Sequence, residues 1–356
     1  MHLLISFAST RSPACLDALP GLALPNLRRL LAQLAPESSD TGDAQSLSAP
    51  HERAMARALG LPMQDGQIAF AAYCAADCAA SNAPASLKVQ ASAGWAFVTP
   101  CHWQMGQDHV RMLDPSSLQL SSAHAQLLRQ AMQPYFAEDG IELQGACMPG
   151  AMGQPAALSW LAQGALLRDM ACASLDRVSG RELSDWMPQG QGARVVRRLQ
   201  SEMQMLLYTH PVNDERQQLG LLPINSFWVS GCGALPARGH ANRPNDGAAQ
   251  TSMRSNPLAD DEHGNDPADL MVDRSLRKAA LADDPAAFIA AWQQLDAGPV
   301  QRLQEALRQG DAVQLTLCGE RSSASWTGPP QGLGAKAGQW LRGLRSPTVQ
   351  QVLASL

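Results

Sequence analysis

The sequence predicts an α/β protein in which a mixed sheet is flanked by helices. Short apolar runs typical of buried strands recur along the whole chain, and segments with apolar residues at helical spacing lie between them. Of the 356 residues, 45% are hydrophobic and 17% are charged, which is enough apolar material for a sizeable core. We therefore expect one large domain with a helical C-terminal portion.

The N-terminal half is predicted to alternate between the two element types. Strands are expected at 2–8, 86–99, 110–113 and 141–145, and helices at 27–34, 50–59, 118–132 and 193–208. The Ser-, Asp- and Gly-rich segment 36–49 is predicted as a surface loop. The strands 86–99 and 110–113 are expected to form a hairpin across a polar connection. In the last helix, Arg198 and Glu202 are spaced to pair at i and i+4.

The C-terminal half is predicted to begin with a buried strand at 221–229, closed by a tight turn at 230–233. Further helices are expected at 270–281, 288–295, 300–307 and at the C-terminus, with a strand at 313–318. These segments suggest an α/β main domain at 1–235, a flexible insertion or linker at 236–267, and a part at 268–356 that packs on the main domain.

Charge and hydropathy exclude several classes of protein. The net charge of −5 leaves no basic face for a run of phosphates, so we expect no nucleic-acid partner. No apolar stretch reaches the roughly 18–20 residues that span a bilayer. The N-terminal apolar run ends at Ser6, has no preceding Lys or Arg, and is too short for an export signal. With eight dispersed cysteines, free thiols and a cytoplasmic location are expected.

A first candidate site is the polar connection 99–109, which contains His102, Asp108 and His109. Histidine exchanges a proton near neutral pH, and loops held by a sheet often carry function. The alternative is a hairpin loop whose imidazoles bond to the neighbouring backbone. No spacing rule selects between the two readings.

A zinc site can be assembled from the soft ligands near this connection. It would use Cys74, Cys78, Cys101, His102 and His109. The Ala-rich surroundings of the first two cysteines fit a helix with buried thiols equally well. No residue is therefore assigned as a metal ligand.

A second candidate site is the strand end that contains Asn225, Trp228, Gly231 and Gly233. A strand that ends in G-x-G lets an anionic ligand approach backbone N–H groups. The run lacks the third glycine and the following helix of a dinucleotide fingerprint. Packing explains the tryptophan as well as ligand contact does.

The chain resembles a known family in five segments taken together. These are HLLISFAS at the start, SLSAPHER at 46–53, TPCHWQMGQDHV at 99–110, LPINSFWVSGCG at 222–233 and LTLCGE at 315–320. The pattern resembles an uncharacterised proteobacterial family labelled phosphoglycerate mutase or RpfE-type regulatory protein. The N-x-x-W-x-x-G-x-G run is similar to a motif of archaeal-type cofactor-independent phosphoglycerate mutases. That resemblance implies an alkaline-phosphatase-like core, here in degenerate form.

The resemblance also implies a chemistry from which this sequence departs. Those mutases use two divalent metals and a Ser nucleophile, and their first strand ends in Asp followed by Gly. Here the first strand ends in Ser6-Phe7-Ala8-Ser9, without a carboxylate. We therefore expect a binding or regulatory protein without an intact two-metal site, whose partner is a small anionic metabolite or a protein.

The alternative is an enzyme of the phosphoglycerate mutase type. It would act on a small phosphorylated or anionic metabolite through His102, Asp108 and His109. The cofactor stays open, with a divalent metal as one option. In either case, if the two candidate sites form one pocket, the imidazoles should lie within roughly 10–12 Å of the Gly231 backbone, at the same sheet edge.

Overall fold

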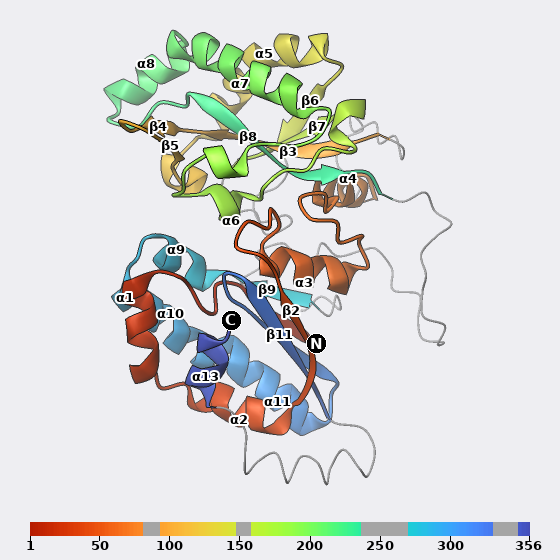
Figure 1. The fold of residues 1–356 in the computed structure, drawn as a ribbon, viewed down its shortest axis with the longest axis vertical. Coiled ribbons are helices and arrows are strands. Elements are labelled where there is room, and N and C mark those ends of the chain that lie inside the picture. The colour runs from red at the N-terminus through yellow and green to blue at the C-terminus, as the bar shows by residue number, and fades with distance from the viewer. Residues whose placement is uncertain (81–92, 147–157, 236–269, 330–347) are drawn as a thin grey trace. The chain divides into compact units, whose positions relative to one another are not determined.

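The computed structural model describes residues 1–80, 93–146, 158–235, 270–329 and 348–356 and has a mixed α/β fold (Figure 1). This confirms the predicted fold class of a mixed sheet flanked by helices. The chain forms two compact units. Unit 1 comprises Met1–Ala44, Ala49–Ala58 and Asp266–Leu356, and unit 2 comprises Gln45–Ser48 and Leu59–Asn265.

The sheet of unit 1 has five strands in the order β2-β11-β10-β1-β9. Their bounds are β1 His2–Ile5, β2 Ala35–Thr41, β9 Leu270–Asp273, β10 Val313–Cys318 and β11 Ser322–Gly328. The central strand β1 pairs in parallel with both β9 and β10, whereas β11 is antiparallel to β10 and to β2. The carboxyl ends of β1, β9 and β10 therefore meet at one edge of the sheet.

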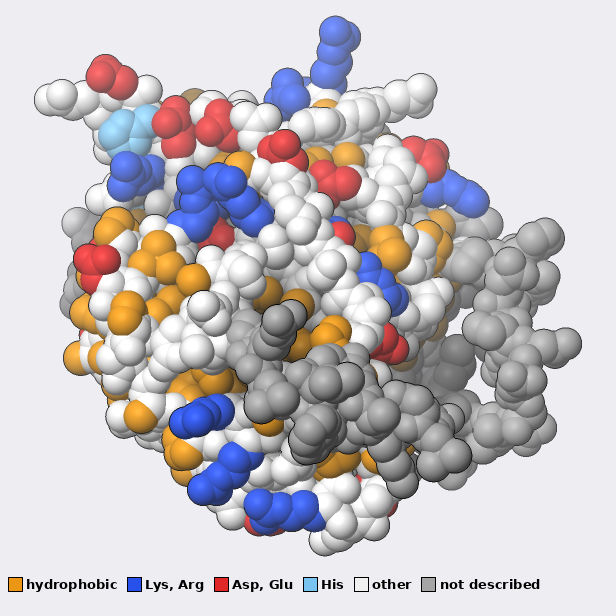
Figure 2. All heavy atoms as spheres, turned by 60° about the horizontal axis from the view of Figure 1, so that its bottom comes forward, with side chains coloured by type: hydrophobic (Ala, Val, Ile, Leu, Met, Phe, Trp, Pro, Cys, Tyr) orange, Lys and Arg blue, Asp and Glu red, His pale blue; other side chains and the backbone are white. Residues whose placement is uncertain are grey.

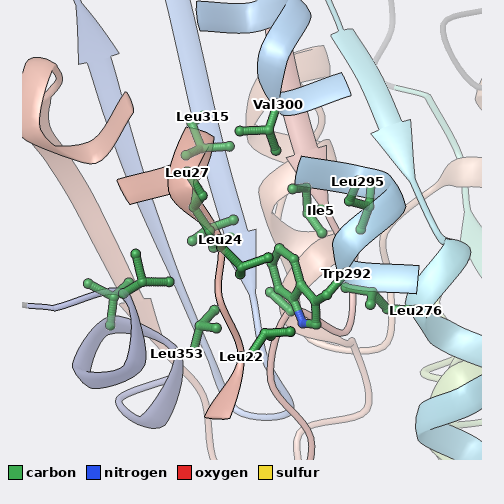
Figure 3. Close-up of a cluster of buried hydrophobic side chains, with 14 of the residues drawn as sticks. Ile5, Leu22, Leu24, Leu27, Leu276, Trp292, Leu295, Val300, Leu315 and Leu353 are labelled. Carbon is green, nitrogen blue, oxygen red and sulfur yellow. The ribbon is translucent and has the colours of Figure 1, made fainter. Parts of the chain in front are cut away.

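Helices cover one face of this sheet and bury its main core. They are α1 Pro13–Ala18, α2 Pro25–Gln33, α9 Ser275–Leu281, α10 Pro285–Leu295, α11 Gln301–Gln309 and α13 Val349–Ala354. Trp292 of α10 is fully buried among Ile5, Leu24 and Leu276 (Figure 3). A short turn η1 at Leu19–Gly21, a π-helical turn η6 at Asp296–Val300 and helix α3 Pro50–Leu59 complete the unit's described elements.

The start of α2 shows how unit 1 satisfies a buried carboxylate. Asp296 is 4% exposed, and its two oxygens accept hydrogen bonds from the backbone N–H groups of Asn26 at 3.1 Å and Leu27 at 2.7 Å. The first N–H groups of a helix have no partner within the helix, so a carboxylate at this position stabilises both groups.

The main sheet of unit 2 has four strands in the order β6-β7-β3-β8. Their bounds are β3 Trp95–Cys101, β6 Glu142–Ala146, β7 Trp160–Gln163 and β8 Ser226–Gly233. Every pair in this sheet is antiparallel. A separate hairpin consists of β4 Trp103–Met105 and β5 Val110–Met112.

Helices lie on both faces of the unit 2 sheet. Figure 1 shows α5 Ser122–Glu138, α7 Ala193–Tyr208 and α8 Pro211–Gln218 on one side, and α4 Phe70–Ala80 and α6 Leu175–Val178 on the other. Short 3-10 turns are η2 Pro115–Leu118, η4 Ala165–Leu167 and η5 Ser184–Trp186. The predicted stripe of α7 is buried, and Arg198 lies 3.6 Å from Glu202, as its spacing predicted.

Several predicted elements differ from the structure. The expected loop at 36–49 contains β2, an exposed edge strand that the polar composition concealed. The expected helix at 270–281 is β9 followed by α9, and the expected turn at 230–233 is part of β8. The hairpin predicted between 86–99 and 110–113 is wrong, because β5 pairs with β4, and β3 belongs to the main sheet.

Unit 1 combines segments from both ends of the sequence. Residues near the N-terminus, which were predicted as part of a main domain at 1–235, lie in the same unit as the C-terminal segment. The reason is that β1 pairs directly with β9 and β10. The predicted linker at 236–267 lies outside the described residues. Among the described helices, none is both long and apolar enough to cross a membrane.

Candidate functional site

His102 of the first candidate site and Gly233 of the second lie at opposite ends of the β3–β8 pair, whereas Asn225 of the second site lies beside the first. Cys101, which precedes His102, pairs with Ser226, whereas Gly233 pairs with Trp95. Six residues of strand separate these ends, which at about 3.3 Å per residue is about 20 Å. The prediction of a shared pocket is therefore wrong. The physical reason is that neighbouring antiparallel strands end at opposite edges of a sheet.

His102 and Asn225 have partners that extend the strand pairing beyond the end of β3. The side chain of Asn225 accepts a hydrogen bond from the backbone N–H of Trp103 at 2.7 Å and donates one to the Trp103 carbonyl at 2.9 Å. The Nδ1 atom of His102 lies 2.8 Å from the carbonyl oxygen of Pro223 and donates to it, because a carbonyl can only accept. Both side chains thus hold the β4–β5 hairpin against the loop before β8.

Asp108 and His109 lie at the turn of this hairpin. The backbone N–H of Gly106 donates to the carbonyl of His109 at 2.8 Å, which closes the turn. Asp108 is exposed and His109 is half-buried. A Cβ atom at Gly106 would lie 3.0 Å from the His109 ring, so the glycine makes room for the imidazole. The local geometry matches the alternative of a hairpin loop.

Trp228, Gly231 and Gly233 pack inside unit 2. Trp228 is fully buried, and its Nε1–H donates to the carbonyl of Ala173 at 2.8 Å. A Cβ atom would lie 2.9 Å from Phe97 Cδ2 at Gly231, and 2.9 Å from the Ala69 Cβ at Gly233. Close packing of a neighbouring strand and of the segment before α4 therefore accounts for both glycines.

The zinc ligand set is not assembled by the described residues. Cys74 and Cys78 lie on α4, whereas Cys101 ends β3, where burial raises the pKa of its thiol. Within the described ranges, no group of three or more His, Cys, Asp or Glu side chains is placed to hold a metal ion. The adjacent acidic residues and histidine Asp261, Glu262 and His263 could also bind a metal by residue type, but they lie outside those ranges.

Polar and charged residues do converge at the carboxyl ends of the parallel strands in unit 1. The hydroxyl of Ser6, just after β1, donates to the carbonyl of Asp273 at the end of β9, at 2.9 Å. The Ala8 N–H donates to the Cys318 carbonyl at the end of β10, at 2.8 Å. These bonds tie the segment after β1 to both neighbours. In open α/β sheets, ligands bind outside such ends.

The residue between these two ties has an unusual backbone. Phe7 has φ +56°, the left-handed region that a bulky side chain rarely adopts. Its ring packs against the imidazole of His51 on α3, with ring centroids 5.6 Å apart. Strained residues of this kind cluster at functional sites, where the surrounding structure holds them in place.

Helix α3 and strand β2 supply an ion pair to unit 1. The Nε atom of Arg53 lies 2.7 Å from the carboxylate of Asp40, and the Arg53 guanidinium also donates to the Arg321 carbonyl at 3.2 Å. Arg57, one helical turn later, approaches the same carboxylate only to 4.0 Å, and its side chain is 41% exposed. Arg53 is thus held by two partners, whereas the Arg57 side chain is partly exposed.

The charges around Cys318 favour an anion. Burial raises the pKa of this thiol, and the nearby charges that act on it are the guanidinium groups of Arg53, Arg57 and Arg274 and the carboxylate of Asp40. The three guanidinium groups lower the pKa of the thiol and the Asp40 carboxylate raises it, so basic side chains lie near the carboxyl end of β10. On the face drawn in Figure 2, basic and acidic side chains occur together.

The two-metal centre implied by the resemblance does not fit the described residues at this edge. Ser6 uses its hydroxyl on a backbone carbonyl. Asp273 accepts from the N–H and the hydroxyl of Ser275 at 2.9 and 2.7 Å, and Asp40 is paired with Arg53. Metal centres of this type need several carboxylates and imidazoles directed at a common point. Guanidinium groups are suited to bind phosphate or carboxylate instead.

Sequence reasoning missed most of this edge. His51 and Arg53 are part of the segment SLSAPHER, which contributed to the resemblance but showed no spacing typical of a site. Asp40 lies in a segment predicted as a loop, and Arg274 in one predicted as a helix. The available signal was the end of the first strand at Ser6, where ligands of parallel sheets bind.

Two curated phosphoglycerate mutases match short segments of this chain, in agreement with the resemblance described above. No family model matches the chain. It is 34% identical over 70 residues to the 2,3-bisphosphoglycerate-independent phosphoglycerate mutase of Methanothrix thermoacetophila, covering 20% of this chain and 18% of that protein. It is also 34% identical over 59 residues to a probable enzyme of this name from Geobacter sulfurreducens, covering 17% and 15%. The matches thus span less than a fifth of these relatives.

Two solved structures are similar over most of the chain at low identity. The cofactor-independent phosphoglycerate mutase of Thermoplasma acidophilum is 13% identical, with 92% of this chain and 89% of that chain covered and a TM-score of 0.34. A Pyrococcus horikoshii protein is 12% identical, with 92% and 86% covered and a TM-score of 0.42. The similarity in sequence to cofactor-independent phosphoglycerate mutases rests on the matches of 70 and 59 residues.

Proposed function

We propose that this chain is a phosphoglycerate-mutase-like protein that binds a small phosphorylated or carboxylated metabolite and acts as a binding or regulatory protein. The ligand would lie at the carboxyl ends of β1, β9 and β10 in unit 1. We also propose that the protein is bacterial, lies in the cytoplasm and is of the RpfE regulatory type. In that role it would bind a protein partner that responds to the metabolite.

The observation that carries the proposal is the end of the first parallel strand. The residue there is Ser6, whose hydroxyl bonds to the Asp273 carbonyl, in a position where the resembling mutases have a carboxylate. The guanidinium groups of Arg53, Arg57 and Arg274 near the end of β10 favour an anion. Binding and release of such a ligand require no reacting group on the protein.

The test is a binding measurement paired with an activity measurement on the full chain. We expect 2- or 3-phosphoglycerate, or inorganic phosphate, to bind saturably by calorimetry and to raise the unfolding temperature as ligand binding requires. With manganese or zinc added, we expect no interconversion of the two phosphoglycerates. Turnover in the ordinary range of about 1 to 10³ per second would contradict the proposal.

The enzyme alternative makes a distinct prediction for the same assays. If His102, Asp108 and His109 carry chemistry, His102→Ala abolishes turnover while the unfolding temperature stays nearly unchanged. The hydrogen bond from His102 to Pro223 favours a positioning role instead. Failure of every tested phosphorylated or carboxylated metabolite to bind would overturn the proposed ligand class.

A further inference from the structure

Two cysteines that are far apart in the sequence lie side by side in unit 2. The Sγ atoms of Cys172 and Cys232 are 3.3 Å apart, across 60 residues of chain. Both side chains are buried, at 3% and 0% exposed, and belong to the same cluster of apolar residues.

A β-bulge turns Cys232 toward Cys172. Trp95 pairs with Gly233 and Phe97 with Ser230, so the single residue Ala96 faces two residues of β8. Gly231 has φ +63°, as the first residue of a bulge of this type requires. Without the extra residue, alternation would place Cys232 on the face of Trp228. With it, Cys232 joins the cluster that contains Phe227 and Val229.

Backbone contacts fix Cys172 from both sides. Its N–H donates to the carbonyl of Gly66 at 2.9 Å. The preceding residue, Ala171, exchanges two hydrogen bonds with Gln189 at 2.9 and 3.1 Å, and the carbonyl of Ala173 accepts from the Trp228 indole. The segment 171–173 is therefore bonded to β8 through Ala173, the residue after Cys172.

We propose that Cys172 and Cys232 form a reversible disulfide when a small hydroperoxide oxidises the protein. One thiol is converted to a sulfenic acid as the peroxide O–O bond breaks and one water leaves. The second thiol then attacks the sulfenic sulfur, forms the S–S bond and releases a second water. In sum, two thiols and one hydrogen peroxide give one disulfide and two waters, and two electrons pass from sulfur to peroxide.

The change in geometry is small and the reaction is slow. The sulfur atoms must approach by about 1.3 Å to reach the roughly 2.05 Å of a disulfide, and the glycines that flank Cys232 ease a shift of the backbone there. Burial and the neighbouring thiol raise the pKa of Cys172, so its thiolate is scarce at neutral pH. Oxidation should therefore accelerate as the pH rises above neutral.

The bond would restrain a long loop of unit 2. A cross-link across about 60 residues removes much conformational freedom from the unfolded chain. It would also fix the bulge of β8 to the segment 171–173. Oxidation thus acts as a covalent modification that stiffens this end of the unit 2 sheet, and a thiol reductant reverses it.

The experiment is oxidation of the folded, reduced full chain with hydrogen peroxide at pH 8, followed by alkylation in denaturant and peptide mass spectrometry. We expect a peptide pair joined through Cys172 and Cys232, and an unfolding temperature raised by about 5–15 °C that dithiothreitol restores. Cys172→Ser and Cys232→Ser should each abolish the joined peptide and the shift. Cys78→Ser, at a half-buried position on α4, should keep both.

Other outcomes overturn the proposal. The joined peptide in wild-type protein is decisive whether or not the serine variants fold. Both cysteines fully alkylated after prolonged oxidation, or joined only to other cysteines, would refute the pair. The same oxidation in urea provides the reference for random pairing, and a joined peptide no more abundant in the folded protein than in urea would also refute it.

Discussion

The two units differ in where their sheets place the polar residues that follow a strand. In unit 1, β1, β9 and β10 run parallel, so Ser6, Asp273 and Cys318 arrive at one edge. In unit 2, β3 and β8 run antiparallel, so His102 and Gly233 arrive at opposite edges. The rule that ligands gather at carboxyl ends of strands therefore applies to unit 1 and not to the unit 2 pair.

The difference extends to how the polar groups are used. In unit 2, Asn225 and Trp228 bond to backbone groups of Trp103 and Ala173, so each contributes to holding the unit together. In unit 1, Arg57 makes only a long contact with Asp40 and is partly exposed. Substitutions should thus reduce stability in unit 2 and ligand affinity in unit 1.

The largest effect is expected from Trp228→Ala in unit 2. The change removes a fully buried indole and leaves the Ala173 carbonyl without its donor, so the free energy of unfolding should fall by about 3–5 kcal/mol. Denaturation followed by circular dichroism measures this. Trp326→Ala, at a partly buried position on β11 of unit 1, is the matched control and should cost less. Equal losses would contradict the structural role assigned to Trp228.

A smaller loss is expected from Asn225→Ala, by about 1–3 kcal/mol. The variant loses both hydrogen bonds to the Trp103 backbone, which is half-buried. Asn225→Asp keeps the acceptor and loses the donor, so its stability should lie between those of wild type and Asn225→Ala. If Asn225→Ala instead unfolds at the wild-type denaturant concentration and binds the metabolite more weakly, Asn225 contacts the ligand and has no structural role.

The comparison predicts the reverse result for Arg57→Ala in unit 1. Loss of one charge-assisted contact should weaken binding of a phosphorylated metabolite about tenfold by calorimetry. The free energy of unfolding should change by less than about 0.5 kcal/mol, because the side chain is 41% exposed and its ion pair is long. Arg308→Ala, exposed on α11, is the control and should bind normally. Equal affinities of the two variants would rule out the proposed position of the ligand.

Long amphipathic segments of the fold could be predicted from the sequence, and edge strands could not. Helix α7 has the predicted bounds because its apolar residues repeat over four turns. Strand β2 has a polar sequence and an exposed edge, so its residues carry no apolar alternation. Strand β9, only four residues long, merged with the following helix in the apolar pattern. Short strands take their identity from their neighbours in the sheet rather than from local sequence.

The candidate site required the strand directions, which apolar runs do not encode. Asn225 and His102 were singled out because polar groups followed apolar runs, but the β3–β8 register decides what they contact. Arg53 and Asp40 are 13 residues apart and lie on different elements, so their ion pair depends on the packing of β2 against α3. The bulge at Gly231 was likewise hidden, because glycines favour a turn and a bulge equally.

The smallest expected effect is a pH dependence that comes from His210 of unit 2. Its Nδ1 atom accepts a hydrogen bond from the Val212 N–H at the start of α8, at 3.2 Å, which requires the unprotonated nitrogen. Burial holds the pKa of His210 below its ordinary 6.5, although Asp214 partly offsets this. The unfolded chain therefore binds a proton at this residue before the folded chain does, as the pH falls below about 6.5.

Stability from His210 should be complete above that pH and should decline as the pH falls toward the lower pKa of the folded state. His210→Asn keeps a side-chain acceptor for the first turn of the helix but cannot titrate. Denaturation at pH 7.5 and pH 5.5 should show a smaller loss for His210→Asn than for wild type. Identical losses would mean that His210 is protonated equally in both states and that its ring does not cap α8. The hydrogen bond from the Val212 N–H to His210 would then not count among the internal bonds that distinguish unit 2 from unit 1.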